Sequence, residues 1–183
     1  MLKPAILFQT FTFVLLSALP VTAQGYATDK GSIRIGGSGN FSSSKSEGAE
    51  NRTTILDLRP DVQYFVAPGL ALGGELSLTR SSNGDASNTL VGIGPIASYY
   101  FGGAERTQPF VSARLGVSQA TFGGDDLTQT SMRGAAGLLM LLSSSVGVSS
   151  ELFYSYTRVE FAGTGDSNSN NFGLALGIAA FLF

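Results

Sequence analysis

The chain has 183 residues, of which 43% are hydrophobic and 13% charged, and its formal net charge is −2. This nearly balanced charge gives no electrostatic footprint for nucleic acid, so we expect no nucleic-acid partner. The sequence contains no cysteine and no histidine, which excludes disulfides, thiolate metal sites and a serine nucleophile activated by histidine.

The first 23 residues have the pattern of a cleaved secretion signal. Lys3 supplies a positive charge, residues 4–19 are mostly apolar, and residues 20–23 end in the small residue Ala23. The apolar stretch is shorter and more interrupted than the ~20 predominantly apolar residues that a membrane-spanning helix needs. We therefore predict a signal peptide over residues 1–23, cleavage after Ala23, and one exported domain over residues 24–183.

The remaining chain contains eight segments in which apolar residues alternate with small or polar ones, a pattern typical of strands with one apolar face. In chain order these segments cover residues 32–41, 54–64, 70–79, 89–101, 109–121, 131–142, 146–157 and 171–183. Their length of about 10 to 13 residues matches the ~9 to 11 that a tilted strand needs to cross a bilayer. Helix is disfavoured because the chain carries 24 glycines, and each costs ~1 kcal/mol relative to alanine in a helix interior.

The connectors between these segments alternate between long polar stretches and short ones. Residues 42–52, 80–88, 122–130 and 162–170 are long and rich in Ser, Gly, Asn and Asp, whereas residues 66–69, 102–108 and 143–145 are shorter. Transmembrane β-barrels have long extracellular loops and short periplasmic turns. The sequence therefore predicts an all-β fold, an eight-stranded antiparallel up-and-down transmembrane β-barrel, with four mobile surface loops.

Three features of the sequence predict either local departures from regular strand pairing or contacts with the membrane interface. Pro60 and Pro95 fall inside predicted strands, where the missing N–H calls for a bulge or a local gap in the ladder. Phe181 and Phe183 are out of phase with the apolar positions of residues 172–178, so either the last strand is irregular or its register differs. Aromatic residues near the strand ends predict interface girdles. These are Tyr64, Tyr99, Tyr100, Phe101, Phe110, Phe181 and Phe183 on the periplasmic side and Phe41, Tyr154, Tyr156, Phe161 and Phe172 on the outer side.

Residues 94–101 precede a predicted periplasmic turn, residues 109–116 open the next strand, and Phe183 ends the chain. On these segments the chain resembles the small eight-stranded outer-membrane barrels of the OmpA/OmpX type, over essentially all of residues 24–183. The resemblance implies an outer-membrane location in a Gram-negative envelope. It also implies outer-membrane lipids and the barrel-assembly machinery as partners, with Phe183 as the assembly signal.

Eight charged residues fall on the polar face of the predicted strands, which should line the barrel. They are Arg34, Asp57, Arg59, Asp61, Glu75, Arg114, Arg133 and Glu151. Because an eight-stranded barrel is just wide enough to be filled by its own side chains, these four cations and four anions predict a network of ion pairs that plugs the lumen. A narrow low-conductance channel for ions or very small solutes is the alternative. In OmpA-type barrels, interior pairs of this kind are similar to a gate that controls small conductances, but the plug is favoured because filling by side chains is the default at this strand number.

No motif in the sequence predicts catalysis. The resemblance does not extend to the barrel-shaped enzymes that use histidine, and a glycosidase-like pair among Asp57, Asp61, Glu75 and Glu151 is explained more simply by the plug. Residues 92–97 match a dinucleotide-binding pattern, but Pro95 and the aromatic run after it continue a strand instead of opening a helix. Asp125, Asp126 and Asp166 lack the ligand spacing of a calcium loop. We therefore expect no enzyme, no cofactor and no metal site.

The sequence thus predicts a barrel that presents surface loops for envelope integrity, adhesion or another interaction. Beside the narrow channel, a soluble lipocalin-like binding barrel is a further alternative; it needs an apolar set that faces the core and a wet exterior, and the charges on the glycine-rich face argue against it.

Overall fold

The computed structural model describes residues 26–44, 52–84, 86–102, 105–122, 125–161 and 165–183. The predicted signal peptide lies outside these residues. Within the described ranges, no helix has the length and hydropathy needed to cross a membrane.

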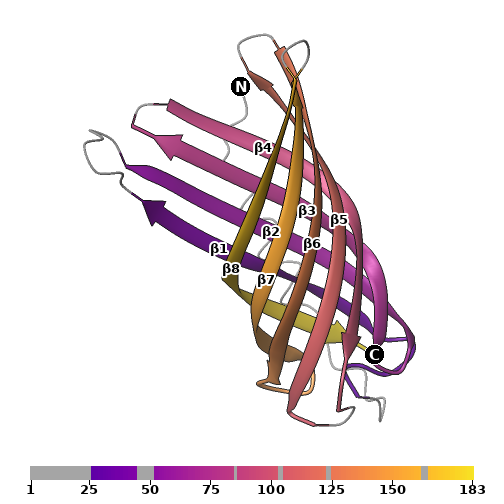
Figure 1. Cartoon of the computed structure of the whole chain (residues 1–183). Helices are drawn as coiled ribbons and strands as arrows, with labels where there is room; N and C mark the ends of the chain where they lie inside the picture. The colour runs from indigo at the N-terminus through magenta and orange to yellow at the C-terminus, as the bar shows by residue number, and fades with distance from the viewer. Residues whose placement is uncertain (1–25, 45–51, 85, 103–104, 123–124, 162–164) are drawn as a thin grey trace, which may run out of the picture.

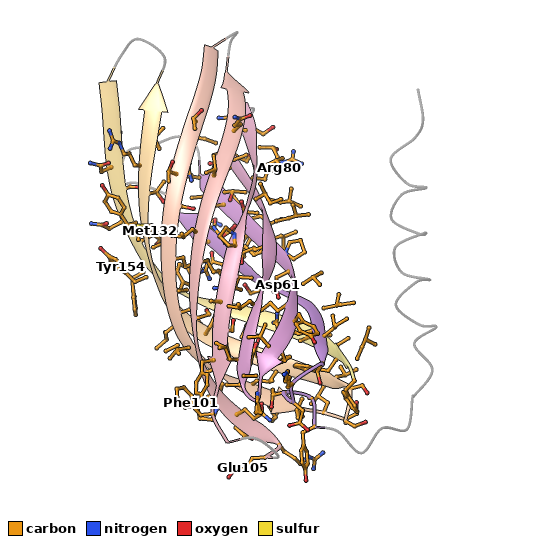
Figure 2. All side chains as sticks on the ribbon, turned by 90° about the vertical axis from the view of Figure 1, so that its right-hand side faces the viewer. Asp61, Arg80, Phe101, Glu105, Met132 and Tyr154 are labelled. Atoms are coloured by element: carbon orange, nitrogen blue, oxygen red, sulfur yellow. The ribbon has the colours of Figure 1, made fainter. Side chains whose placement is uncertain are left out.

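Eight antiparallel strands follow one another around a closed barrel in chain order, and the predicted fold class is confirmed (Figure 1). The strands are β1 (Ile33–Ser44), β2 (Thr53–Ala67), β3 (Leu70–Asn83), β4 (Ala86–Tyr100), β5 (Thr107–Phe122), β6 (Asp125–Leu141), β7 (Val146–Phe161) and β8 (Gly165–Leu182). We call the end at which β8 finishes the base, and the opposite end, at which β1 finishes, the rim. Figure 2 shows Phe101 and Glu105 at the base and Arg80 toward the rim.

Alternation sorts the side chains as the sequence predicts. Leu76 and Leu115 are about half exposed on the outside, whereas their neighbours Glu75 and Arg114 are buried inside. The same outward apolar face continues around the barrel, for example at Ile93, which is 66% exposed. A soluble lipocalin-like barrel would bury this face, so the structure contradicts that alternative.

The strands extend farther toward the rim than predicted, and the prediction of long loops is wrong for most residues of 80–88, 122–130 and 162–170; of the loop predicted over 42–52, residues 45–51 lie outside the described residues. β3 continues to Asn83 and β4 resumes at Ala86, where Gly84 closes the hairpin with a positive φ of 61°. β8 begins at Gly165. Ladder hydrogen bonds are made by the backbone, so a Ser- and Asn-rich segment can remain a strand when both faces meet water. The loop prediction therefore failed here because it rested on the polar composition of these segments, which strands can share.

Both prolines interrupt their ladders without changing the register. In β2–β3 the pairing runs from Leu58↔Leu78 to Asp61↔Glu75, and the intervening positions at Pro60 are skipped. In β4–β5 the same happens at Pro95, between Ile93↔Val117 and Ile96↔Arg114. The expected local gap is confirmed at both prolines. The missing donor costs ladder hydrogen bonds without forcing a bulge.

The last strand is regular, which corrects the suspected irregularity. β8 pairs with β1 and β7 without a register shift. Its outward positions continue from Ile178 to the exposed Leu182, while Phe181 points inward and is only 1% exposed. Phe181 is therefore out of phase because it belongs to the interior.

The predicted basal girdle is correspondingly smaller. Tyr64, Tyr99 and Phe101 are exposed on the outside, in positions suited to an interface. Tyr100 and Phe110 are buried within the barrel, as is Phe181. Nearness to a strand end did not separate the two sets, because parity decides which face an aromatic residue occupies. At the rim, Phe41, Tyr154, Tyr156 and Phe172 are exposed as predicted, and the side chain of Phe161 lies outside those described.

Candidate functional site

All eight predicted charged residues lie on inward positions of the barrel. Six of them are buried, namely Arg34, Asp61, Glu75, Arg114, Arg133 and Glu151. The side chains of Asp57 and Arg59 are only 14% and 17% exposed. Since burying an unpaired charge is costly, each of these groups needs a counter-charge.

Six of these residues form a closed ring of alternating charge, which we call the charge ring. Its order is Asp57, Arg59, Glu75, Arg114, Glu151, Arg133 and back to Asp57. The nitrogen–oxygen distances around the ring, in the same order, are 2.9, 3.0, 2.9, 3.0, 2.7 and 3.6 Å. β2, β3, β5, β6 and β7 each contribute to it, so the ring extends across the lumen.

Glu151 has the densest set of partners in the charge ring. Arg114 donates to it through both terminal nitrogens, from Nη1 to Oε1 and from Nη2 to Oε2, each at 3.0 Å. Arg133 Nη2 donates to Oε1 at 2.7 Å, and Ser38 Oγ lies 3.4 Å from the same oxygen. The paired geometry with Arg114 is the strong, orientation-specific form of a charge-assisted hydrogen bond.

The other side of the ring is looser. Arg114 Nε lies 2.9 Å from Glu75 Oε2, close enough for an ion pair, but the two atoms are not aligned for a hydrogen bond. The longest contact joins Arg133 Nη1 to Asp57 Oδ2 at 3.6 Å. Arg133 gains a further contact from the Phe153 ring, whose centroid lies 3.5 Å from the guanidinium carbon. A cation over an aromatic face is attracted by the ring quadrupole.

Arg34 and Asp61 form a separate pair nearer the base. Gln63 Nε2 donates to Asp61 Oδ1 at 2.8 Å, and Gln63 itself is only 1% exposed. The two halves of the predicted network are thus a ring and a pair, each with its own hydrogen-bonding neighbours.

An aromatic floor, which was not among the predicted site residues, closes the lumen at the base. It consists of Phe65, Tyr100, Phe110, Leu139 and Phe181, all nearly fully buried. The Phe65 ring lies 5.6 Å from that of Tyr100 and 6.4 Å from that of Phe181, centroid to centroid. The inward parity of these positions was the signal that could have separated them from the girdle.

The chain immediately before β1 packs onto this floor. Ala27 belongs to the same apolar cluster and is 3% exposed. Gly69 N donates to Thr28 O at 2.8 Å, and Gly31 N donates to Phe65 O at 2.9 Å. The segment is therefore held by backbone hydrogen bonds to β2 and to the β2–β3 turn. Floor and charge ring lie in series along the lumen.

The arrangement does not favour catalysis by the carboxylates. Glu75 faces Arg59 and Arg114, and Glu151 faces Arg114 and Arg133. A glycosidase needs one carboxyl group that can hold a proton beside an accessible bond, whereas these groups are engaged by arginines. Within the described part of the chain, no cluster of three or more potential metal-ligating residues occurs.

No family model matches the chain, and no curated protein sequence matches it significantly. Solved structures do resemble it. Neisserial surface protein A superposes with a TM-score of 0.55 at 20% identity, over 82% of this chain and 97% of that one. The outer membrane protein OprG from Pseudomonas aeruginosa gives 0.52 at 14% identity, over 87% and 98%. This chain has the fold of the small eight-stranded outer-membrane barrels. The resemblance seen in the sequence is thereby confirmed at the level of the fold.

Proposed function

We propose that the protein is an outer-membrane barrel whose lumen is closed by a plug of ion pairs, and that it serves the envelope as a structural or interaction protein. The observation that carries this proposal is the closed charge ring. Its six members leave each charge facing opposite charges on two sides. Because each charge of the ring has counter-charges within the protein, the ring does not require a permeating ion for neutralisation.

The exterior supports the membrane part of the proposal. A wide outward band of Leu, Ile and Val side chains is exposed, among them Leu76, Ile93 and Leu176. Soluble monomers rarely expose contiguous apolar patches beyond a few hundred Å², whereas a transmembrane barrel needs such a band. Export with cleavage after Ala23, and assembly with Phe183 as the signal, belong to the same proposal.

The rim supports an interaction role. Residues Ser167–Asn171 of β8 are exposed on both faces and are entirely polar. With the base in the periplasm, this polar strand would extend above the apolar band and face the exterior. Surface-exposed polar strand ends of this kind can contact a partner or another cell surface.

A narrow channel is the second candidate, because one side of the charge ring is weaker. The Arg133–Asp57 contact is the longest at 3.6 Å, and Asp57 and Arg59 are the most exposed members of the ring. Conduction would also require a path past the aromatic floor, so two closures would have to open together.

One experiment separates the two candidates. Heat-modifiable gel mobility in the outer-membrane fraction first verifies that the protein is folded there. The protein is then purified and inserted into planar bilayers. The plug predicts near-zero conductance for the wild type, and a steady open pore would promote the channel instead. A protein that stays soluble without detergent would overturn the membrane assignment as a whole.

A further inference from the structure

The barrel is least completely closed between its first and last strands. β1 and β8 pair over only seven residue pairs, from Ile33↔Leu182 to Gly39↔Leu176. β1 nevertheless continues to Ser44, and β8 begins at Gly165. Figure 1 shows β1 and β8 diverging toward the rim, so that β1–β4 lean away from β5–β8. We call this divergence the seam.

The ladder between β4 and β5 also ends before its strands do, but the seam begins deeper in the apolar band. β4 and β5 pair only as far as Val91↔Gln119, and the next outward residue of β4 is Thr89. That divergence therefore begins where the apolar band ends. At the seam, by contrast, the first outward residues beyond the last pair are Phe41 and Leu174, which are 67% and 56% exposed.

Phe172, one outward position farther along β8, is 71% exposed. The strands of the seam therefore separate while their outer faces are still apolar. Inside hydrocarbon, each backbone polar group without a partner costs several kcal/mol. An edge that opens at this depth has to be covered by something that brings both apolar surface and hydrogen-bonding groups.

The seam is bridged at its lower end by a side chain. Asn40 directly follows Gly39 of the last backbone pair, and its Nδ2 donates to Leu174 O, two positions beyond Leu176, at 2.9 Å. On the lumen side, the next inward residue of β1 is Ser42, and Asn171 of β8 and Ser155 of β7 share the inward parity. Hydroxyl and amide groups therefore lie directly behind an apolar outer edge.

We propose that the seam is a lateral window that binds a lipid of the surrounding leaflet. The acyl chain lies against Phe41, Phe172 and Leu174, and the polar head reaches the hydroxyl and amide groups behind them and the free strand edges. An amphiphile fits both requirements of the seam, since its chain continues the lipid band while its head supplies hydrogen bonds. This goes beyond the plug, because the charge ring and floor close the axial path and leave the lateral one.

The test uses tryptophan fluorescence, since the chain contains no tryptophan of its own. Ser42→Trp places the reporter on the lumen side of the seam. Ser81→Trp is the matched control, because Ser42 pairs with Ile55 and Ile55 with Ser81, so the two positions share one row of the barrel two strands apart. Phe41→Trp reports direct exposure to lipid.

Each variant is placed in nanodiscs of phosphatidylcholine whose acyl chains carry bromine near the head group, because bromine quenches tryptophan on contact. We expect strong quenching at Phe41→Trp and several-fold more quenching at Ser42→Trp than at Ser81→Trp. Equal quenching at Ser42→Trp and Ser81→Trp, with Phe41→Trp quenched, would overturn the proposal. A second copy or a peptide that filled the seam would give this result. Ser44→Trp, the next inward position, provides the same test if Ser42→Trp does not refold.

Closing the seam gives the decisive second measurement. The chain has no cysteine, so a Ser43→Cys/Phe172→Cys pair can be bridged specifically with a short bifunctional thiol reagent. These two positions would lie opposite each other if the β1–β8 register continued. Bridging should reduce quenching of Ser42→Trp to the level of Ser81→Trp. The control pair Ile35→Cys/Ala180→Cys joins positions that are already paired and should leave quenching unchanged. Undiminished quenching after bridging of the seam would refute lipid entry there.

Discussion

The charge ring predicts a specific pattern of coupled stability changes, centred on Arg114 and Glu151. Glu151→Ala leaves Arg133 with Asp57, at 3.6 Å, as its counter-charge in the ring, and leaves Arg114 with Glu75. Breaking a buried ion pair by removing one partner costs ~3 to 5 kcal/mol. We place Glu151→Ala near the upper end of that range, because it leaves two cations short of a counter-charge.

Arg114→Ala should cost less than Glu151→Ala. After this change Glu75 keeps Arg59 at 3.0 Å, and Glu151 keeps Arg133 at 2.7 Å. The double variant removes one charge of each sign, so it should be less destabilised than the sum of the single variants, by ~0.5 to 3 kcal/mol for residues in direct contact. Glu105→Gln, at an exposed acid of the base, is the matched control and should be near neutral.

The assay is equilibrium unfolding in urea from lipid vesicles, followed by circular dichroism and by gel mobility without heating. The same variants are measured in planar bilayers, where both single variants should raise the conductance above the wild-type level by loosening the plug. Free energies of unfolding that add within ~0.3 to 0.5 kcal/mol, together with unchanged conductance, would show that the two residues do not share a network.

Three further predictions test the orientation, the faces and the strand packing. A tag at Pro68 should be hidden in intact cells until the outer membrane is permeabilised, whereas a tag in the β3–β4 hairpin should be accessible at once, and the reverse accessibility would overturn the orientation. Leu76→Arg should destabilise by ~2 to 4 kcal/mol by placing a charge in the lipid band, and equal tolerance of Ser77→Arg would contradict the assigned faces. Gly94→Ala, whose added Cβ would meet Leu115 O at 1.7 Å, should lower the unfolding free energy by ~1 to 3 kcal/mol. Gly134→Ala, with nothing within 4 Å, should be tolerated, and similar urea midpoints for the two variants would refute the packing argument.

The number of strands, their order and their faces could be predicted because a two-residue period records directly which side chains share a face. The inward position of residues such as Glu75 and Arg114 follows from the same period. Phe181 shows the limit of treating an apolar residue as lipid-facing by default. Its parity placed it inside, whereas its chemistry alone suggested the girdle.

The connections within the charge ring could not be predicted, because they depend on how the strands are staggered around the barrel. Asp57 and Arg133 lie 76 positions apart on strands that do not pair, and only the tilt of a closed barrel brings them to one level. The seam is equally invisible in the sequence. Ser42–Ser44 would suit a paired strand as well as a free edge, and the choice is made by the curvature of the two halves.

Charge ring and seam are two aspects of one arrangement. Toward the rim the barrel separates into β1–β4 and β5–β8, and the ring places Asp57, Arg59 and Glu75 on the first half and Arg114, Arg133 and Glu151 on the second. The first set carries one excess negative charge and the second one excess positive charge. Among the described residues of the ring, Glu75–Arg114 and Asp57–Arg133 are the ion pairs that cross between the halves.

These two contacts therefore join the halves across the lumen, in addition to the β1–β8 and β4–β5 ladders. Attraction between opposite excess charges is stronger in a low-dielectric interior than in water, so a small number of pairs can oppose the divergence of the strands. The proposed plug and the proposed lateral window would then be coupled, because the two pairs that join the halves would limit how far the seam can open.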